Sequence, residues 1–431
     1  MAGRTDRAQS ARVDPLTPKL LSTLRGNYSA RDLRADAFAG LTVAVVALPL
    51  SLAIAIASGV GPERGLYAAV VGGFLISLLG GSRFQIGGPA GAFIVLVSAT
   101  VAAHGVDGLM VVTFLAGALM LVAGWLRLGR FIRHVPAPVT LGFTAGIALI
   151  ILTSQIKEFF GLTLAGPEPG PLWPRLQALA AGLPSASIAA AALAVLTLGI
   201  IVGLRRWRPR WPNLLLALIV ATALTAVADL PVATVGGRYG ALPSGLPLPS
   251  WPDLSWARIV ELAPLSLSFA LLGGIEGLLS AVVADGLGGG RHRPDAELVA
   301  QGAANMATAL FGGLVVTGTI ARTATNVRAG ARSPMAGMLH AALVLVFLWI
   351  AAPLMAAIPL AALAGLLVTV AWNMAERHAV LQALRGPRDA ALVLAATFLL
   401  TVLDDLTTGI VGGIVLSTAL RWRGGRSRQG M

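Results

Sequence analysis

Long apolar runs recur from about residue 37 to residue 420, and clusters of proline, glycine and charged residues separate them. Most runs approach the ~20 residues that a helix needs to cross a bilayer. The pattern therefore predicts an all-α polytopic membrane protein with fourteen transmembrane segments. We expect them near residues 37–58, 64–80, 89–103, 108–128, 138–154, 186–203, 212–229, 259–286, 296–313, 319–330, 335–354, 359–374, 389–403 and 406–420.

A polar link that is rich in proline and glycine divides these segments into two groups of seven. Because seven is odd, the second group enters the membrane with the opposite orientation, as in an inverted repeat. We therefore predict five parts of the chain. They are a cytoplasmic N-terminal region 1–34, a first repeat 35–229, an extracytoplasmic linker 230–257, a second repeat 258–420 and a cytoplasmic tail 421–431.

The third and tenth segments are too short to cross a bilayer as straight helices. Loose, small-residue stretches lead into them, at 85–93 and 315–327. Interrupted segments at matching places in two halves of a membrane protein indicate a substrate site at the midplane. Their helical N-termini carry partial positive charge and therefore suit an anion. Ala90 and Gly91 let backbone N–H groups approach that anion closely.

Composition and charge placement support a protein of the cytoplasmic membrane. The chain is 56% hydrophobic and 12% charged, and its mean hydropathy is +0.81. Its formal net charge of +13 is placed asymmetrically. If both termini are cytoplasmic, only five of the 32 lysine and arginine residues lie in outer loops, namely Arg64, Lys157, Arg175, Arg238 and Arg258. The positive-inside rule accounts for this bias, so no nucleic-acid partner is needed.

Enzymatic chemistry finds little support in the sequence. The chain has no cysteine, which excludes disulfides, thiolate metal sites and cysteine nucleophiles. It contains no Walker A, GxGxxG or HExxH motif. We therefore predict no cofactor, no metal and no enzyme activity.

Arg322 is the strongest candidate for an anion-binding residue. It lies one helical turn into the tenth segment, close to the converging N-termini, together with Thr319 and Ala321. Intramembrane charge usually marks a substrate pathway, and a guanidinium can bind a carboxylate or sulfate with two hydrogen bonds. The alternative is a structural cation paired with Glu276. Thr317 is expected only to cap the tenth segment.

Several motifs together resemble the SulP anion permeases. They are Leu48-Pro49, Gly88-Pro89, GIEGLLS at 274–280, DAELVAQGAAN at 295–305 and TGTIARTATNVRAGARSP at 317–334. The similarity runs from about residue 30 to residue 420. Among the members, the chain resembles prokaryotic proton-coupled carriers of dicarboxylates such as fumarate.

The resemblance implies two intertwined repeats arranged as a core domain and a gate domain. Segments 1–4 and 8–11 would form the core, and segments 5–7 and 12–14 the gate, with the core moving past the gate in an elevator mechanism. Many members also end in a soluble STAS domain, which this chain does not contain. The oligomeric state stays open, with a homodimer as one alternative.

The resemblance also assigns roles to three residues. It places the proton-coupling acid at Glu276, with Ser280 four residues later. Leu50 and Ile54 take positions that are polar or aromatic in some relatives, so they imply a drier pocket, suited to an anion with an apolar middle. The alternatives are a static bridge from Glu276 to Arg322, and simple packing for Leu50 and Ile54.

The sequence thus predicts a secondary active transporter of small anions, which takes up a dicarboxylate such as fumarate together with a proton. Alternatives are a sulfate or bicarbonate symporter, a passive anion channel or exchanger, and a voltage-responsive structural membrane protein.

Overall fold

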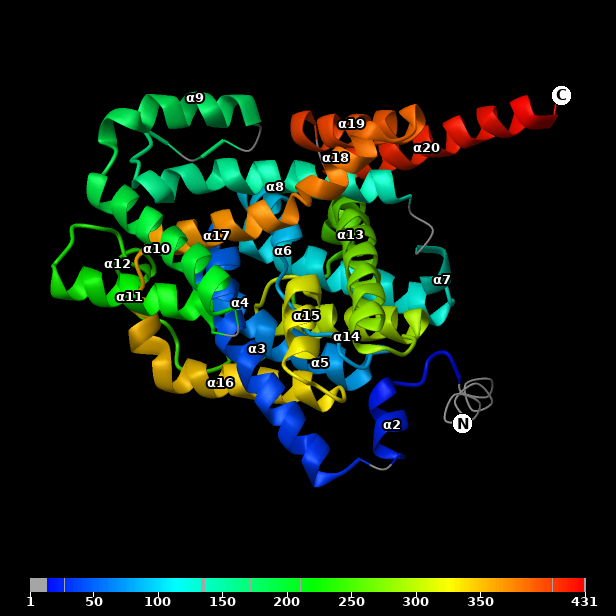
Figure 1. Cartoon of the computed structure of the whole chain (residues 1–431), viewed down its shortest axis with the longest axis horizontal. Helices are drawn as coiled ribbons and strands as arrows, with labels where there is room; N and C mark the ends of the chain where they lie inside the picture. Colours follow the sequence, from blue (N-terminus) through cyan, green and yellow to red (C-terminus); the bar gives the residue numbers. More distant parts are fainter. Residues whose placement is uncertain are drawn as a thin grey trace.

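The computed structural model describes residues 14–26, 28–132, 136–166, 168–169, 172–209, 211–404 and 406–429. The chain forms a bundle of helices (Figure 1). The first half contains α2 Lys19–Leu24, α3 Ala30–Ala57, α4 Pro62–Tyr67, the π-helix η2 Ala68–Gly72, α5 Gly73–Leu79, the 3-10 turn η3 Gly91–Phe93, α6 Ile94–Trp125, α7 Gly129–Ile132, α8 Ala137–Phe160, α9 Leu172–Gly182, the 3-10 turn η4 Leu183–Ser185, α10 Ile188–Trp207, α11 Asn213–Val227 and α12 Val235–Tyr239. The second half contains α13 Trp256–Gly288, α14 Pro294–Leu310, α15 Ile320–Arg328, α16 Met335–Ala356, α17 Leu360–Met374, α18 Arg377–Arg385, α19 Arg388–Leu403 and α20 Leu406–Gln429.

The helices pack in two groups. In the core group, α6 packs on α14 and α13, α3 packs on α16, and α15 contacts both α13 and α3. In the gate group, α8 packs on α17 and α19, α19 on α20, and α10 on α17. Elements of the two chain halves alternate in both groups, so the repeats are intertwined. The packing confirms the predicted all-α architecture with its core and gate.

Local signals explain where several helices begin and end. Ser29 and Asp32 form a reciprocal capping box at the start of α3. Pro294 occupies the first turn of α14, and Gly161 ends α8 in the left-handed conformation that glycine adopts at no steric cost. These caps fix the entry and exit of long apolar helices.

Segments two to four follow one another closely in the chain, and their backbone shows two interruptions. Segments three and four correspond to the two parts of α6, which are two helices that meet at a kink at Gly105 (φ 70°, ψ −176°). The part before this kink is the predicted short segment three. Segment two is interrupted by η2. Within the described residues, seven helices are long and apolar enough to cross a membrane by themselves. Others, such as the 15-residue α11 and α17, are shorter.

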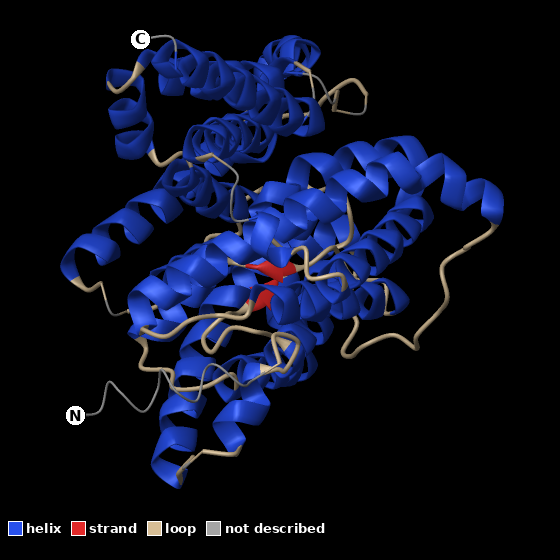
Figure 2. Cartoon of the chain, turned by 90° about the vertical axis from the view of Figure 1, so that its right-hand side faces the viewer, coloured by secondary structure: helices blue, strands red, loops and turns tan. Residues whose placement is uncertain are grey.

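A two-stranded pairing lies in the middle of the molecule (Figure 2). Strand β1, Gly87–Gly88, pairs antiparallel with β2, Thr317–Gly318. The sequence analysis treated both stretches as loose entries and did not predict this pairing. It joins the two half-helices of the opposite repeats at their N-terminal ends.

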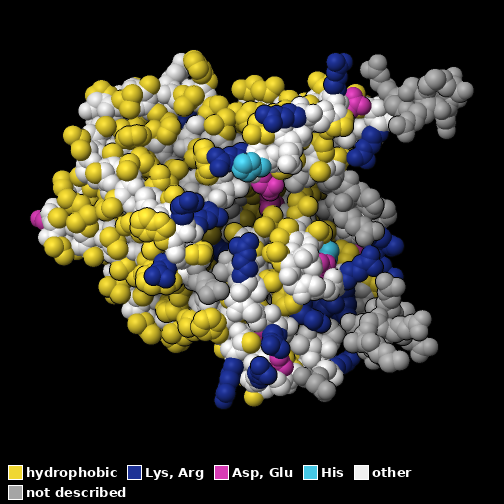
Figure 3. Space-filling model, viewed as in Figure 1, with side chains coloured by type: hydrophobic (Ala, Val, Ile, Leu, Met, Phe, Trp, Pro, Cys, Tyr) yellow, Lys and Arg dark blue, Asp and Glu magenta, His cyan; other side chains and the backbone are white. Residues whose placement is uncertain are grey.

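The surface has a polar and an apolar side. Lysine and arginine side chains gather over the centre and right of Figure 3, whereas the left side is mostly hydrophobic. Helix α2 and the end of α20 both lie toward the right in the same view (Figure 1). This distribution fits a chain embedded in lipid, with α2 toward the more basic side.

Candidate anion site between two broken helices

The backbone of the site consists of the β1–β2 pair and the two helices that follow it. Gly87 pairs with Gly318, and Gly88 with Thr317. The N–H of Thr319 then donates to the carbonyl of Ile86 at 3.0 Å, just before α15 begins. Neither η3 nor α15 has a first-turn N–H group that donates to the side chain of its own N-cap residue. The first-turn N–H groups of both half-helices therefore lack the usual local partner.

Buried amides hold this backbone in place. The side chain of Asn305 accepts from the N–H of Val316 and donates to its carbonyl, both at 2.8 Å. Asn326 donates to the carbonyl of Phe84 at 2.9 Å. These amides join elements of the core group.

Glu297 is a buried anchor that the sequence analysis missed. Its carboxylate is fully buried and accepts from the N–H groups of Gly81 and Ser82, at 2.9 and 3.0 Å, and from the amide of Gln85 at 2.8 Å. It thereby fixes the link between α5 and β1. An acidic residue in the first turn of α14 was a signal, but its partners lie more than 200 positions earlier in the chain.

Arg322 is buried inside the core group at 1% exposure. Its Nη2 donates to Ser51 Oγ at 3.2 Å and to the carbonyl of Pro89 at 3.4 Å. Nε and Nη1 have no hydrogen-bond partner. Arg322 forms no ion pair with any described residue, so the alternative of a bridge to Glu276 is wrong for this conformation.

Gly88 leaves room for that guanidinium. A β-carbon on Gly88 would collide with Arg322 Nη1. Only glycine lets the β1 backbone approach the cation this closely. The first repeat therefore shapes the space around a charge that the second repeat supplies.

Glu276 lies on α13, which belongs to the same core group as Arg322, and the residue is 9% exposed. It has neither an ion pair nor a hydrogen bond to any described residue. Ser280, one turn further along, lies 3.2 Å from the hydroxyl of Thr323 on α15. The acid and its neighbour thus belong to the helix that packs directly on the Arg322 half-helix.

The apolar candidates are buried residues of α3 and of the turn that leads into η3. Leu50 and Ile54 are 7% and 2% exposed, and Ala90 is 8% exposed. Gly91 faces the gate: a β-carbon there would lie 3.7 Å from the side chain of Ile151 on α8. Leu50, Ile54 and Ala90 are thus buried, whereas Gly91 lies at the boundary between the core and the gate.

The remaining candidate residues on the tenth segment differ in exposure and in hydrogen bonding. Ala321 is exposed, whereas the adjacent Arg322 points inward. Thr319 donates its hydroxyl to the carbonyl of Ile86 at 3.3 Å. The prediction that Thr317 caps α15 is wrong, because its buried hydroxyl donates to the carbonyl of Gly273 at 3.0 Å. The N-cap residue is Thr319, two positions later.

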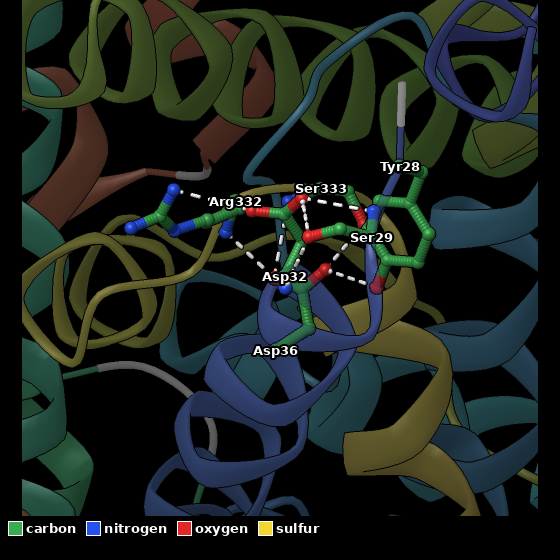
Figure 4. A network of polar contacts seen from close by, with 6 residues as sticks. All are labelled: Tyr28, Ser29, Asp32, Asp36, Arg332 and Ser333. Carbon is green, nitrogen blue, oxygen red and sulfur yellow. Dashed lines mark hydrogen bonds and ion pairs between the residues drawn. The ribbon is translucent and has the colours of Figure 1, made fainter. Parts of the chain in front are cut away.

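A second network fixes the far end of α15 (Figure 4). Asp36 on α3 accepts from the N–H groups of Arg332 and Ser333 at 2.6 and 3.1 Å, and from the hydroxyl of Ser333. Tyr28 also donates to Asp36, at 2.8 Å. Burial, and next the hydrogen bond to Asp36, raises the pKa of Tyr28 to about 12, so its hydroxyl stays a donor at neutral pH. The network ties the α15–α16 link to α3.

Two broken helices that meet head to head around a buried cation, inside a core flanked by a gate, are the features of an anion-transporting membrane protein. Residues 33–397 match the model of the sulfate permease family. The chain belongs to this family and is a multi-pass anion transporter, not an enzyme.

Relatives of known name support this membership. The Bacillus subtilis protein YvdB, named for sulfate transport, is 43% identical over 392 residues, which cover 90% of this chain and 74% of YvdB. The bicarbonate transporter BicA of Picosynechococcus is 33% identical over 403 residues, covering 90% of this chain and 70% of BicA.

Solved structures agree with the fold. The transmembrane domain of a cyanobacterial BicA matches with a TM-score of 0.81 and 33% identity, over 89% of this chain and 98% of that domain. SLC26A9 matches with a TM-score of 0.85 over 97% of this chain and 69% of its own, but at 19% identity it supports the fold alone.

Proposed function

We propose that this protein is a secondary active transporter that carries sulfate or bicarbonate across the cytoplasmic membrane, with Arg322 as the anion-binding cation. The names of its relatives support these two substrates. They favour what the sequence analysis held as an alternative over fumarate uptake.

The observation that carries the proposal is the unpaired state of Arg322. An arginine at the centre of a membrane helix costs about 2.5–3.5 kcal/mol on insertion scales. Here the side chain is buried, and two of its three guanidinium nitrogens lack a partner. A bound anion would supply the missing acceptors and the missing charge.

A fumarate-type dicarboxylate is the second candidate. Leu50, Ile54 and Ala90 are apolar and buried. Such a lining suits a ligand that has carbon between its charged ends. The relatives described above are named for sulfate and bicarbonate, so these two substrates rank first.

Glu276 is the proposed proton-coupling group, and the core is proposed to move past the gate. A negative interior opposes anion entry by about 2.3 kcal/mol per charge per 100 mV. One proton cancels this penalty for a monoanion and halves it for a dianion. A carboxyl on the helix next to Arg322, free of ion pairs, is placed to take up that proton when the anion binds.

The test is uptake by purified protein in proteoliposomes, with radiolabelled sulfate, bicarbonate and fumarate, each with and without an inward proton gradient. We expect saturable uptake of sulfate or bicarbonate by the wild type. Preference for fumarate would replace the leading substrates by the second candidate.

Arg322→Ala should abolish this uptake, because it removes a full positive charge from the site. The matched control is Arg328→Ala, which removes an exposed arginine from the same helix and should keep uptake within about twofold. Full uptake by Arg322→Ala would remove Arg322 from the site, and an equal loss in both variants would indicate general damage to α15.

A further inference from the structure

Arg322 is supplied by the second repeat, but every group that holds its guanidinium belongs to the first. The two acceptors are Ser51 Oγ on α3 and the carbonyl of Pro89, and both bind the same nitrogen, Nη2. This arrangement leaves Nε and Nη1 without partners. The orientation of the free nitrogens therefore depends on how firmly Nη2 is held.

Ser51 is suited to hold it. Its hydroxyl donates to the carbonyl of Ala47 at 2.7 Å, one turn earlier on α3. The single hydroxyl proton is thereby committed, so toward Arg322 the oxygen can act only as an acceptor. The side chain is fully buried.

The backbone of Ser51 is also fixed. Its carbonyl lies against Gly65 on α4, where a β-carbon would collide with it. At the other terminal nitrogen of the guanidinium, the bare backbone of Gly88 limits the position of Nη1. Arg322 is thus bounded by a fixed acceptor and by a backbone surface.

We infer that Ser51 is a positioning residue for anion binding: it accepts from Nη2 of Arg322 and so turns the two free guanidinium nitrogens toward the substrate. This inference rests on the proposed function. It assigns no contact between Ser51 and the anion itself.

The chain offers a closely matched control in Ser58. It terminates the same helix, is 1% exposed, and donates to the carbonyl of Ile54 at 2.7 Å, as Ser51 does to Ala47. Its hydroxyl makes no hydrogen bond to Arg322 or to any other side chain among the described residues. Ser51→Ala and Ser58→Ala therefore remove the same group from the same helix, and differ in the contact with the cation.

The experiment measures KM and Vmax for sulfate and bicarbonate in proteoliposomes. Ser51→Ala should raise KM about tenfold, in line with the loss of one hydrogen bond to a charged group, and change Vmax less than twofold. Ser58→Ala should leave both within about twofold. Equal KM values for the two variants would overturn the inference.

A second variant changes the space around Nη1 of Arg322. Gly88→Ala should also raise KM, because the new methyl group displaces Nη1, whereas Gly199→Ala on α10, which has open space around it, should not. This pair decides the question if Ser51→Ala does not fold: an unchanged KM for Gly88→Ala would then overturn the inference.

If Arg322→Ala stops uptake and both test variants behave as wild type, only the positioning role fails. If the wild type takes up no anion, the proposed function fails as well.

Discussion

At the scale of single residues, Arg322 and Glu276 are ionisable side chains of the core that form no ion pair with any described residue. Arg322 comes from α15 and Glu276 from the adjacent α13. Each would be costly alone in a membrane, and such residues mark pathways for ions or protons. Because Arg322 and Glu276 are not paired with each other in this conformation, a carrier could bind the anion at one and the proton at the other.

Replacing Glu276 by glutamine should uncouple uptake from the pH gradient. The amide has the size of the acid but cannot take up a proton at physiological pH, so the anion would enter without its proton. We expect an inward proton gradient to accelerate wild-type uptake several-fold and to leave Glu276→Gln unchanged. The exposed Glu261→Gln, near the N-terminal end of α13, serves as the control. A gradient response in Glu276→Gln equal to that of the wild type would remove Glu276 from the coupling role.

The sequence identified both of these residues, because a charge inside an apolar run is visible without any structure. It did not identify Ser51 or Glu297. A serine in an apolar helix usually bonds to the backbone one turn earlier, and Ser51 does so as well. Its second role depends on Arg322, which is 271 positions away in the chain.

At the scale of the elements, α15 is held at both ends. The β1–β2 pair fixes its N-terminal end, and the Asp36 network fixes the link that follows its C-terminal end (Figure 4). A nine-residue helix has little stability of its own, so its position depends on these attachments.

Asp36→Asn should loosen the second attachment. In the wild type, several N–H and O–H groups donate to the carboxylate. The amide of the variant would direct its NH₂ group toward one of these donors, and leaving a buried donor without an acceptor costs about 1–3 kcal/mol. We expect a lower midpoint of thermal unfolding in detergent and a reduced uptake rate. Asp107→Asn, at an exposed position, should leave both unchanged. Equal unfolding midpoints for the two variants would show that the network does not stabilise the fold.

At the scale of the whole molecule, the core and gate groups meet through mostly apolar side chains. A hydrogen bond crosses this boundary: Thr407 on α20 donates to Ser268 on α13 at 2.8 Å. Leu96, Phe143, Leu272 and Ile410 surround it. A sliding motion of the core past the gate would have to break this contact.

A disulfide at this position should stop transport. The chain contains no cysteine, so Ser268→Cys combined with Thr407→Cys introduces a single pair, and the short distance between the two oxygens suits a disulfide. We expect oxidation to block uptake and reduction to restore it, because the bond joins groups that must move relative to each other. Each single cysteine variant is the control. Undiminished uptake by the fully oxidised double variant would contradict an elevator motion across this boundary.

The sequence by itself determined the membrane class, the two groups of segments, the short third and tenth segments, and the two charged residues Arg322 and Glu276 inside apolar segments. These properties are local: apolar length, helix-breaking residues and unpaired charge can be read from a few neighbouring positions. Only the tertiary structure decided that β1 pairs with β2, that Glu297 anchors the α5–β1 link, that Thr317 bonds to α13, and that Ser51 holds Arg322. Each of these contacts joins groups that are distant in the chain, and hydrogen-bond geometry between such groups exists only after the two repeats have packed together.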